Sequence, residues 1–376
     1  MVLSGVVWFC RDFARFSGEL ANRTGELSLN SACHSHDERR AEPNKMSEPH
    51  PAETILKLST AYWASRCLHA IAQFGVADAL GDEPETAAAL AKKTGTNADA
   101  LHRILRALCN HSIFTLRDGR FSHNAASRLL RSDNPASMRS LARMMGIDFH
   151  WDVYRDLAHS LTTGESAGYK VQKGGLFEHL RTHPEDGRIF NEAMVGKSFG
   201  QIGPVLGAYD FSPFKTIGDI GGGFGHLLAA ILNAAPGAKG VLFDLPEVVA
   251  QAKARPNPRI TYVPGDFFKD AIPACDLYVM MTVLHDWSDA EAMEILRNLR
   301  AKAPANAKLL LVEAVIDESA TDSFPIDMDI EMLVFASGRE RTQAQWQALL
   351  SKAGFKLTHA APLGGGLSGL VEATVA

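Results

Sequence analysis

Several features that would place this chain in a specialised class are scarce or absent. It has only five cysteines in 376 residues and no CxxC pair, so neither a disulfide framework nor a cysteine zinc site is expected. No run of about 18 apolar residues occurs, so we expect no membrane-spanning helix. The formal net charge of −5 argues against nucleic acid or an anionic membrane as the main partner. These absences favour a cytoplasmic protein with reduced thiols.

The composition itself is that of a globular protein. Hydrophobic residues make up 46% and charged residues 22% of the chain, which is enough for a substantial core, and the length predicts two folded units. The N-terminus differs, because the stretch from Asn22 to Pro51 is polar and rich in Ser, Asn, His and Glu. We expect residues 1–50 to be a disordered extension. Met46 is an alternative start of the chain, since regular hydrophobic spacing begins soon after it.

Residues 51–150 are predicted to form a mostly helical, winged-helix-like domain. Apolar residues recur at helical spacing in four stretches, 53–68, 69–80, 86–93 and 97–109. A small β-hairpin is predicted over 113–122. Helix, turn, helix and hairpin in this order also occur in DNA-binding regulators, but the second helix offers few cations for phosphate contacts and carries Asp99. A helical packing or dimerisation module is therefore favoured over a DNA-binding one.

From residue 201 onward the hydrophobic pattern changes. Short apolar strands are predicted over 214–220, 240–243, 260–263, 277–281 and 308–314. Helices are predicted between them, over 224–234, 245–254 and 290–303. Strands that alternate with helices indicate a parallel sheet covered on both faces, so we expect residues 201–376 to form a doubly wound α/β domain. Residues 151–200 are predicted to be a helical linker.

A glycine-rich loop is predicted where the first of these strands meets its helix. The run from Asp219 to Gly225 reads Asp-Ile-Gly-Gly-Gly-Phe-Gly, and glycines let the backbone turn tightly and approach a ligand. The dinucleotide fingerprint counted from Gly221 requires glycine at 226, where His226 stands. S-adenosylmethionine has no phosphate, and its ammonium group suits the acid at Asp219. The loop therefore favours this ligand over a dinucleotide.

Acidic residues follow the next two predicted strands. Asp244 ends the second strand, where a carboxylate can accept both hydroxyls of a ribose. Asp266 follows the third strand and can hold the exocyclic amine of adenine, while Phe267 can pack on the adenine ring. Together with the glycine loop, these residues predict a cofactor that contains a nucleoside.

A histidine follows the fourth predicted strand, in the run Leu-His-Asp-Trp-Ser-Asp that ends at Asp289. A single histidine in such a place is usually structural, as a helix cap or a packing residue. His285, however, lies at the ligand-binding edge of the predicted sheet and is followed by Asp286. This position is suitable for a general base.

The order of these motifs resembles that in the S-adenosylmethionine-dependent O-methyltransferases of the caffeic acid and hydroxyneurosporene type. Two further runs share the resemblance, Phe-Asn-Glu-Ala-Met from Phe190 and Gly-Arg-Glu-Arg-Thr from Gly338. The similarity covers roughly residues 53–373. It implies a Rossmann-like class I methyltransferase domain preceded by a winged-helix-like domain that mediates dimerisation. It thus implies a homodimer.

The resemblance also implies roles for individual residues. His285 would take the proton from the acceptor hydroxyl, and Glu313 and Glu340 would flank and orient it. The residues implied to bind S-adenosylmethionine are Ser198, Asp219, Gly221, Gly223, Asp244, Asp266 and Phe267. Those implied to line the acceptor pocket, with the helical linker, are Phe190, Met194 and Met332. No Asp, Asn and His set typical of a divalent ion is evident, so no metal is expected.

The implied reaction moves a methyl group to a hydroxyl of a small aromatic molecule. A phenol has a pKa of about 10 and a histidine one of about 6.5, so full proton transfer beforehand would be uphill by about 5 kcal/mol. We therefore expect proton removal by His285 to be concerted with methyl transfer.

Some positions depart from the family pattern. Met281 stands where plant members carry a basic residue four before the histidine, and Lys197 stands where they place a pocket histidine. The segment between Met332 and Glu340 is one residue shorter than in plant enzymes, so the acceptor cannot be transferred from them. Two alternatives stay open: a relative with non-methylating chemistry, and a winged-helix regulator that senses S-adenosylmethionine.

Overall fold

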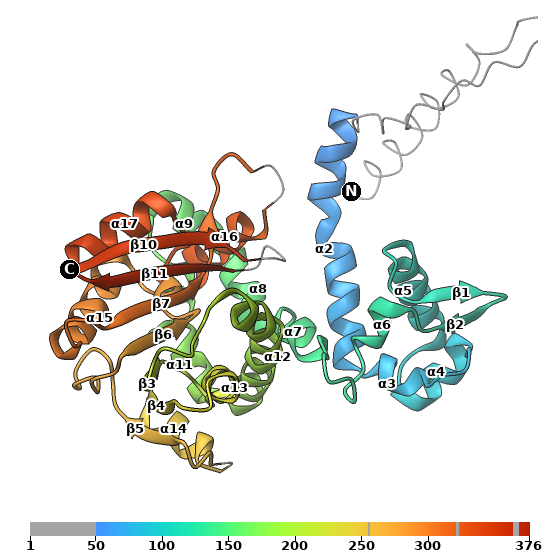
Figure 1. Cartoon of the computed structure of the whole chain (residues 1–376). Coiled ribbons are helices and arrows are strands. Elements are labelled where there is room, and N and C mark those ends of the chain that lie inside the picture. Colours follow the sequence, from blue (N-terminus) through green and yellow to red (C-terminus); the bar gives the residue numbers. More distant parts are fainter. Residues whose placement is uncertain (1–49, 255, 321–322, 364–367) are drawn as a thin grey trace, which may run out of the picture. The chain divides into compact units, whose positions relative to one another are not determined.

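The computed structural model describes residues 50–254, 256–320, 323–363 and 368–376 (Figure 1). The predictions for the N-terminal extension, including the alternative start at Met46, lie outside these residues. The chain divides into two compact units, Met1–Leu56 and Lys57–Ala376. Of the first unit, the structure describes residues 50–56. The described cysteines, Cys67, Cys109 and Cys275, are free thiols.

The first described elements are helices followed by the hairpin. They are α2 (Pro51–Gln73), α3 (Val76–Leu80), α4 (Ala87–Thr94), α5 (Ala98–Asn110), β1 (Thr115–Arg117), β2 (Arg120–Ser122) and α6 (Ala125–Arg128). The predicted helix boundary at residue 69 is wrong. α2 continues to Gln73, and the chain turns only at Gly75, whose φ of +63° is accessible to glycine without strain.

Local side chains explain where these elements begin and turn. The side chains of Thr86 and Asn97 each accept a hydrogen bond from the backbone N–H three residues later, at 3.3 and 3.0 Å, and so cap α4 and α5. The hairpin turn has positive φ at Asp118 (48°) and Gly119 (72°), as a two-residue turn of the type I′ family requires. The predicted hairpin is therefore present, and Asn97 caps the helix predicted over 97–109.

The helices that follow α6 cover the region predicted to be a linker. They are α7 (Arg139–Met144), α8 (Asp148–Arg155), α9 (Leu157–Thr163), α10 (Ala167–Val171), α11 (Gly175–Thr182) and α12 (Pro184–Ala208). α12 runs without a break through residue 200, where the sequence placed a domain boundary. One continuous helix therefore carries Phe190, Met194 and Ser198.

The rest of the described chain is built on a mixed seven-stranded sheet in the order β10-β11-β7-β6-β3-β4-β5. Its strands are β3 (Thr216–Ile220), β4 (Lys239–Asp244), β5 (Ile260–Pro264), β6 (Leu277–Met281), β7 (Lys308–Glu313), β10 (Phe355–Pro362) and β11 (Gly369–Val375). β3 to β7 are parallel, as predicted, whereas β11 is antiparallel to both β7 and β10. The sequence analysis does not predict β10 and β11, red in Figure 1. β10 is an edge strand with an irregular burial pattern and no continuous apolar run, and Glu372 interrupts the short apolar run of β11.

Helices cover both faces of this sheet. They include α13 (His226–Ala234), α14 (Pro246–Ala252), α15 (Asp289–Lys302), α16 (Phe324–Phe335) and α17 (Gln343–Lys352), with the short pair β8 (Val315–Ile316) and β9 (Arg341–Thr342). Val205 of α12 and Leu228 of α13 share a buried cluster with Ile217 of β3, and Trp346 of α17 shares the other cluster with Ile220. Burying each such side chain contributes about 1.5–3 kcal/mol. Within the described ranges, no helix is long and apolar enough to cross a membrane.

Candidate active site

The glycine loop joins β3 to α13 in a conformation that requires its glycines. Gly221, Gly223 and Gly225 have φ of +69°, +57° and +77°, which side-chain-bearing residues rarely adopt. A Cβ at Gly222 would lie 2.4 Å from Cγ of Asp219, which is too close for any other residue. The backbone is therefore held tightly against Asp219 at the carboxyl end of β3.

Two acids lie at this loop. Asp219 is 1% exposed, and its Oδ2 has no hydrogen-bond partner among the described residues. Burial, with the nearby charge of Asp244, raises the pKa of Asp219 to about 7. Asp244 Oδ2 accepts a hydrogen bond from the backbone N–H of Gly223 at 2.7 Å, and Oδ1 accepts one from Leu245 N–H at 2.7 Å. The loop thus combines a buried carboxyl, one oxygen of which has no partner among the described residues, with a second acid held by backbone donors.

Asp266 and Phe267 follow β5. Asp266 Oδ1 accepts a hydrogen bond from Phe268 N–H at 2.9 Å, and Oδ2 pairs with Lys269 at 2.7 Å. The Phe267 ring packs edge-on against Trp287, with centroids 5.8 Å apart. One of its ring atoms lies 3.7 Å from where a Cβ of the first loop glycine would stand. Phe267 therefore borders the glycine loop, while Asp266 is paired with a surface lysine.

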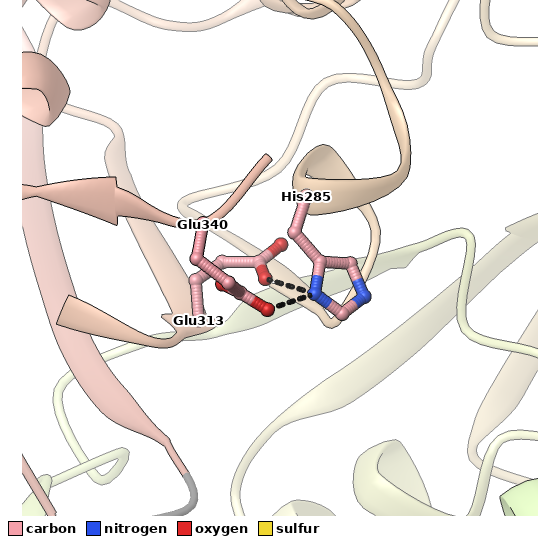
Figure 2. A group of neighbouring side chains, drawn as sticks. All are labelled: His285, Glu313 and Glu340. Atoms are coloured by element: carbon pink, nitrogen blue, oxygen red, sulfur yellow. Dashed lines mark hydrogen bonds and ion pairs between the residues drawn. The ribbon is translucent and has the colours of Figure 1, made fainter. Parts of the chain in front are cut away.

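His285 is the centre of a buried cluster with two glutamates (Figure 2). It lies in the 3₁₀ turn η1 (Leu284–Asp286) after β6 and is 5% exposed. Its Nδ1 lies 2.7 Å from Oε1 of Glu340 and 3.9 Å from Oε2 of Glu313. Its Nε2 lies 3.5 Å from Oδ1 of Asp286. Burial alone would lower the pKa of His285, but the charges of Glu313, Asp286 and Glu340 outweigh burial and raise it to about 9.

Glu313 ends β7 and is fully buried. Its Oε1 accepts hydrogen bonds from the backbone N–H groups of Val283 (2.9 Å) and Leu284 (2.8 Å), which fixes the segment that leads into His285. Burial raises the pKa of Glu313. Its Oε2 has no hydrogen-bond partner among the described residues. Glu313 thus supports the backbone and also faces the imidazole.

The segment that carries Glu340 lies directly against the backbone of His285. A Cβ at Gly338 would be 1.8 Å from the carbonyl oxygen of His285, so only glycine fits there. The next residue, Arg339, donates its backbone N–H to the same oxygen at 2.9 Å. Arg341, fully buried, donates to the carbonyl oxygen of Leu284 at 3.0 Å. These contacts place Glu340 beside the ring from a distant part of the chain.

The same cluster has the composition of a metal site. The nearest ligand atoms of His285, Glu313 and Glu340 all lie within 4.8 Å of one another. One imidazole and two carboxylates can bind a divalent ion.

Helices α12 and α16 carry the residues predicted to line the acceptor pocket. Phe190 and Met194 are partly buried on α12 and pack against the buried cluster that contains Phe335, and Met332 is 8% exposed on α16. Ser198 donates its hydroxyl to the carbonyl oxygen of Met194 at 2.8 Å. Its cofactor contact stays a prediction.

A polar cluster on α8 and α16 has no counterpart in the sequence-based prediction. His150 Nε2 lies 2.9 Å from Oε1 of Glu331, and the hydroxyl of Tyr154 donates to Oε2 of Glu331 at 2.7 Å. The ring of His150 lies 4.2 Å from that of Phe335, centroid to centroid. Glu331 precedes Met332 but is 177 residues from Tyr154 along the chain, so no local pattern indicates their contact.

Two family models match the chain, one over its N-terminal helices and one over the region of the seven-stranded sheet. Residues 154–356 match the family model described as an O-methyltransferase domain, and residues 56–133 match an O-methyltransferase dimerisation domain. The chain belongs to the O-methyltransferase family. It is an enzyme that uses S-adenosylmethionine as methyl donor, and the predicted family, fold class and cofactor are confirmed.

Individual relatives align over nearly their whole length. The phenazine O-methyltransferase PhzM of Lysobacter antibioticus is 40% identical over 325 residues, which cover 85% of this chain and 95% of the relative. A mitomycin biosynthesis 6-O-methyltransferase of Streptomyces lavendulae is 36% identical, covering 85% and 93%. The crystal structure of human N-acetylserotonin methyltransferase with S-adenosylmethionine superposes with a TM-score of 0.80 at 27% identity, covering 88% of this chain and 99% of that one.

Proposed function

We propose that this enzyme methylates a hydroxyl of a small aromatic acceptor, with His285 as the general base. The observation that carries the proposal is the buried imidazole whose Nδ1 lies 2.7 Å from Glu340. In the neutral imidazole, Nδ1 can carry the hydrogen and donate a hydrogen bond to Glu340. Nε2 then keeps a lone pair that can accept the proton of the acceptor hydroxyl. The ring is then oriented in the way that a base needs.

The glycine loop and its acids suit the cofactor. S-adenosylmethionine, when bound, supplies a methyl group on a positively charged sulfur. Asp219, whose buried Oδ2 has no hydrogen-bond partner in the described part of the chain, would accept from the ammonium group. Asp244 at the end of β4 would accept from ribose hydroxyls, and Phe267 beside the loop would pack on adenine. We assign cofactor binding to Ser198, Asp219, Gly221, Gly223, Asp244, Asp266 and Phe267.

The raised pKa of His285 changes the expected energetics of proton transfer. The pKa of His285, about 9, is only about one unit below the pKa of a phenol. Transfer of the proton from the acceptor to neutral His285 would then cost less than the roughly 5 kcal/mol expected for an ordinary histidine. Proton removal before methyl transfer thus becomes accessible, and Glu313 and Glu340 would stabilise the imidazolium that forms.

The aromatic nature of the acceptor is supported by the pocket residues and by the relatives. Phe190, Met194 and Met332 offer apolar surface from α12 and α16. A relative that is 40% identical is named for phenazine methylation. We also propose a homodimer formed through residues 51–150, which include the matched dimerisation domain, with 151–200 contributing to the acceptor pocket.

The proposal is tested with the purified full-length enzyme, labelled S-adenosylmethionine and a panel of hydroxylated aromatic compounds. Matched compounds with the hydroxyl replaced by hydrogen serve as controls. We expect a product heavier by one methyl group from at least one hydroxylated compound and none from its control. Methylation of the control compounds, or binding of S-adenosylmethionine without methylation of any panel member, would contradict it.

A further inference from the structure

Helix α12 carries a buried glutamine, Gln201. Gln201 is 4% exposed, and neither its Oε1 nor its Nε2 has a hydrogen-bond partner among the described residues. A buried amide that has lost water and gained no partner is unfavourable, so such groups commonly bind a ligand or an ordered water. The place of Gln201 in the fold indicates which ligand this is.

The direction of α12 relative to the sheet follows from its C-terminal end. Tyr209, the residue after α12, donates its hydroxyl to Oε2 of Glu372 at 2.7 Å. The same oxygen accepts from Lys308, the first residue of β7, at 2.9 Å. α12 therefore ends at the amino-terminal edge of the parallel strands. Its earlier residues lie toward the opposite edge, where the glycine loop is.

From helix and strand spacing we infer that Gln201 lies level with Asp219. Val205 and Ile217 belong to the same buried cluster. Gln201 precedes Val205 by four residues, which is a distance of about 6 Å along the axis of α12. Asp219 follows Ile217 by two residues, which is a distance of about 6.6 Å along β3 in the same direction.

Both side chains also lie on the same face of the sheet. A Cβ at Gly222 would touch Asp219 and Leu242, and Leu242 belongs to the cluster that contains Val205. On the neighbouring strand β6, Met281 packs against this cluster and offers no hydrogen-bond donor. From this spacing we expect Gln201 to offer a neutral donor near Asp219, whose Oδ2 has no partner among the described residues.

We propose that Gln201 binds the amino-acid end of S-adenosylmethionine, with Nε2 donating to its carboxylate while Asp219 accepts from its ammonium group. A zwitterion complements this pair, because it presents an acceptor and a donor next to each other. Oε1 of Gln201 offers a further acceptor for the ammonium group. This inference rests on the proposed function, since it concerns the same cofactor site.

The test separates the two ends of the cofactor. The full-length enzyme and Gln201→Met are titrated in a calorimeter with S-adenosylhomocysteine and with 5′-methylthioadenosine, which lacks the amino-acid part. We expect Gln201→Met to weaken the binding of S-adenosylhomocysteine about tenfold, because a hydrogen bond to a charged group is lost. Binding of 5′-methylthioadenosine should stay within twofold of the unchanged protein.

Two further variants make the result specific. Gln201→Glu has nearly the same shape, but its negative charge would repel the carboxylate of the ligand. It should therefore weaken the binding of S-adenosylhomocysteine more than Gln201→Met does, again with little effect on the binding of 5′-methylthioadenosine. Gln347→Met, at an exposed position of α17, should change neither affinity. Thermal unfolding of the ligand-free variants verifies that each is folded.

Either of two outcomes would overturn the inference. Equal weakening of both ligands would mean that Gln201 has only a structural role, and unchanged binding of S-adenosylhomocysteine would mean that it makes no contact. If the unchanged enzyme bound neither ligand, the proposed cofactor site would be wrong as well, and that result is recognisable without any variant.

Discussion

Nδ1 of His285 lies 2.7 Å from Oε1 of Glu340, a residue that follows it by 55 positions in the chain. The contact depends on Gly338, which lets the two backbones meet, and on Glu313, which holds the segment before His285 from the other side. A histidine oriented by an acid at one nitrogen can act as a base at the other. Variants of either residue therefore test whether the pair acts as a base.

Replacement of His285 by alanine should abolish most of the activity but leave the cofactor site intact. A positioned general base contributes about 10² to 10⁴-fold to rate, so kcat should fall by that factor. Calorimetry with S-adenosylmethionine should show an unchanged affinity. His111→Ala, at an exposed position, is the matched control. Wild-type turnover in His285→Ala would remove the histidine from the mechanism.

Glu340→Gln should shift the pH profile. His285 must be neutral to accept a proton, and its pKa is raised to about 9, so kcat/KM should rise with pH up to about 9 and then level off. The variant removes a negative charge beside Nδ1, which lowers the pKa of His285 by roughly one unit or more. The rising limb should therefore move to lower pH, as measured with one acceptor for both proteins. An unmoved limb, or one at higher pH, would show that Glu340 does not act on the base.

The sequence predicts the parts of the site that are local. The glycine loop, Asp244 and His285 each follow a parallel strand, and the carboxyl ends of such strands meet at one edge of a sheet. Their proximity therefore follows from the pattern of strands and helices. Glu313 and Glu340 are different: their contact with His285 depends on how distant segments pack, and only the family resemblance indicated it.

The remaining failures have similar causes. β10 is not predicted because an edge strand with an irregular burial pattern has no distinctive hydrophobic period. β11 is largely buried, but Glu372 interrupts its short apolar run. The contact between Tyr154 and Glu331 joins α8 to α16 and leaves no trace in either local sequence. Gln201 gives no signal either, since one polar residue on a helix is normally read as exposed.

Glu313 should matter for stability as well as for catalysis. Glu313→Leu would leave the backbone N–H groups of Val283 and Leu284 buried without an acceptor, which costs about 1–3 kcal/mol each. Glu313→Gln keeps an oxygen for these donors, so its free energy of unfolding should fall much less. Urea unfolding measures both. Equal stability of the two variants would mean that these hydrogen bonds do not support the turn.

Removal of divalent metal should leave the reaction unchanged, although His285, Glu313 and Glu340 are spaced closely enough to bind an ion. A protonated imidazole next to two carboxylates already neutralises part of their charge, which makes the cluster stable without a cation. Dialysis against EDTA should therefore not lower kcat, and elemental analysis should find no stoichiometric metal. Loss of activity that added Zn²⁺ or Mg²⁺ restores would reassign these three residues as ligands.

Gly338→Ala should separate Glu340 from His285 without changing either side chain. The new Cβ would stand 1.8 Å from the carbonyl oxygen of His285, so one backbone must move. The hydrogen bond from Arg339 to the same oxygen would then lengthen. We expect a lower melting temperature and a kcat reduced at least tenfold, because the base loses the acid that orients it.

The matched control for this change is Gly203→Ala, inside α12, where nothing lies within 4 Å of the added Cβ. Alanine is preferred over glycine in a helix by about 0.5–1 kcal/mol, so this variant should be slightly more stable. It should also retain the activity of the unchanged enzyme. Opposite effects of one substitution at two glycines would show that the close approach at Gly338, and not a general sensitivity to added methyl groups, holds the catalytic pair together. Equal activity and stability in both variants would mean that the backbone at Gly338 can shift without loss of stability. Glu340 would then be held beside His285 by other contacts.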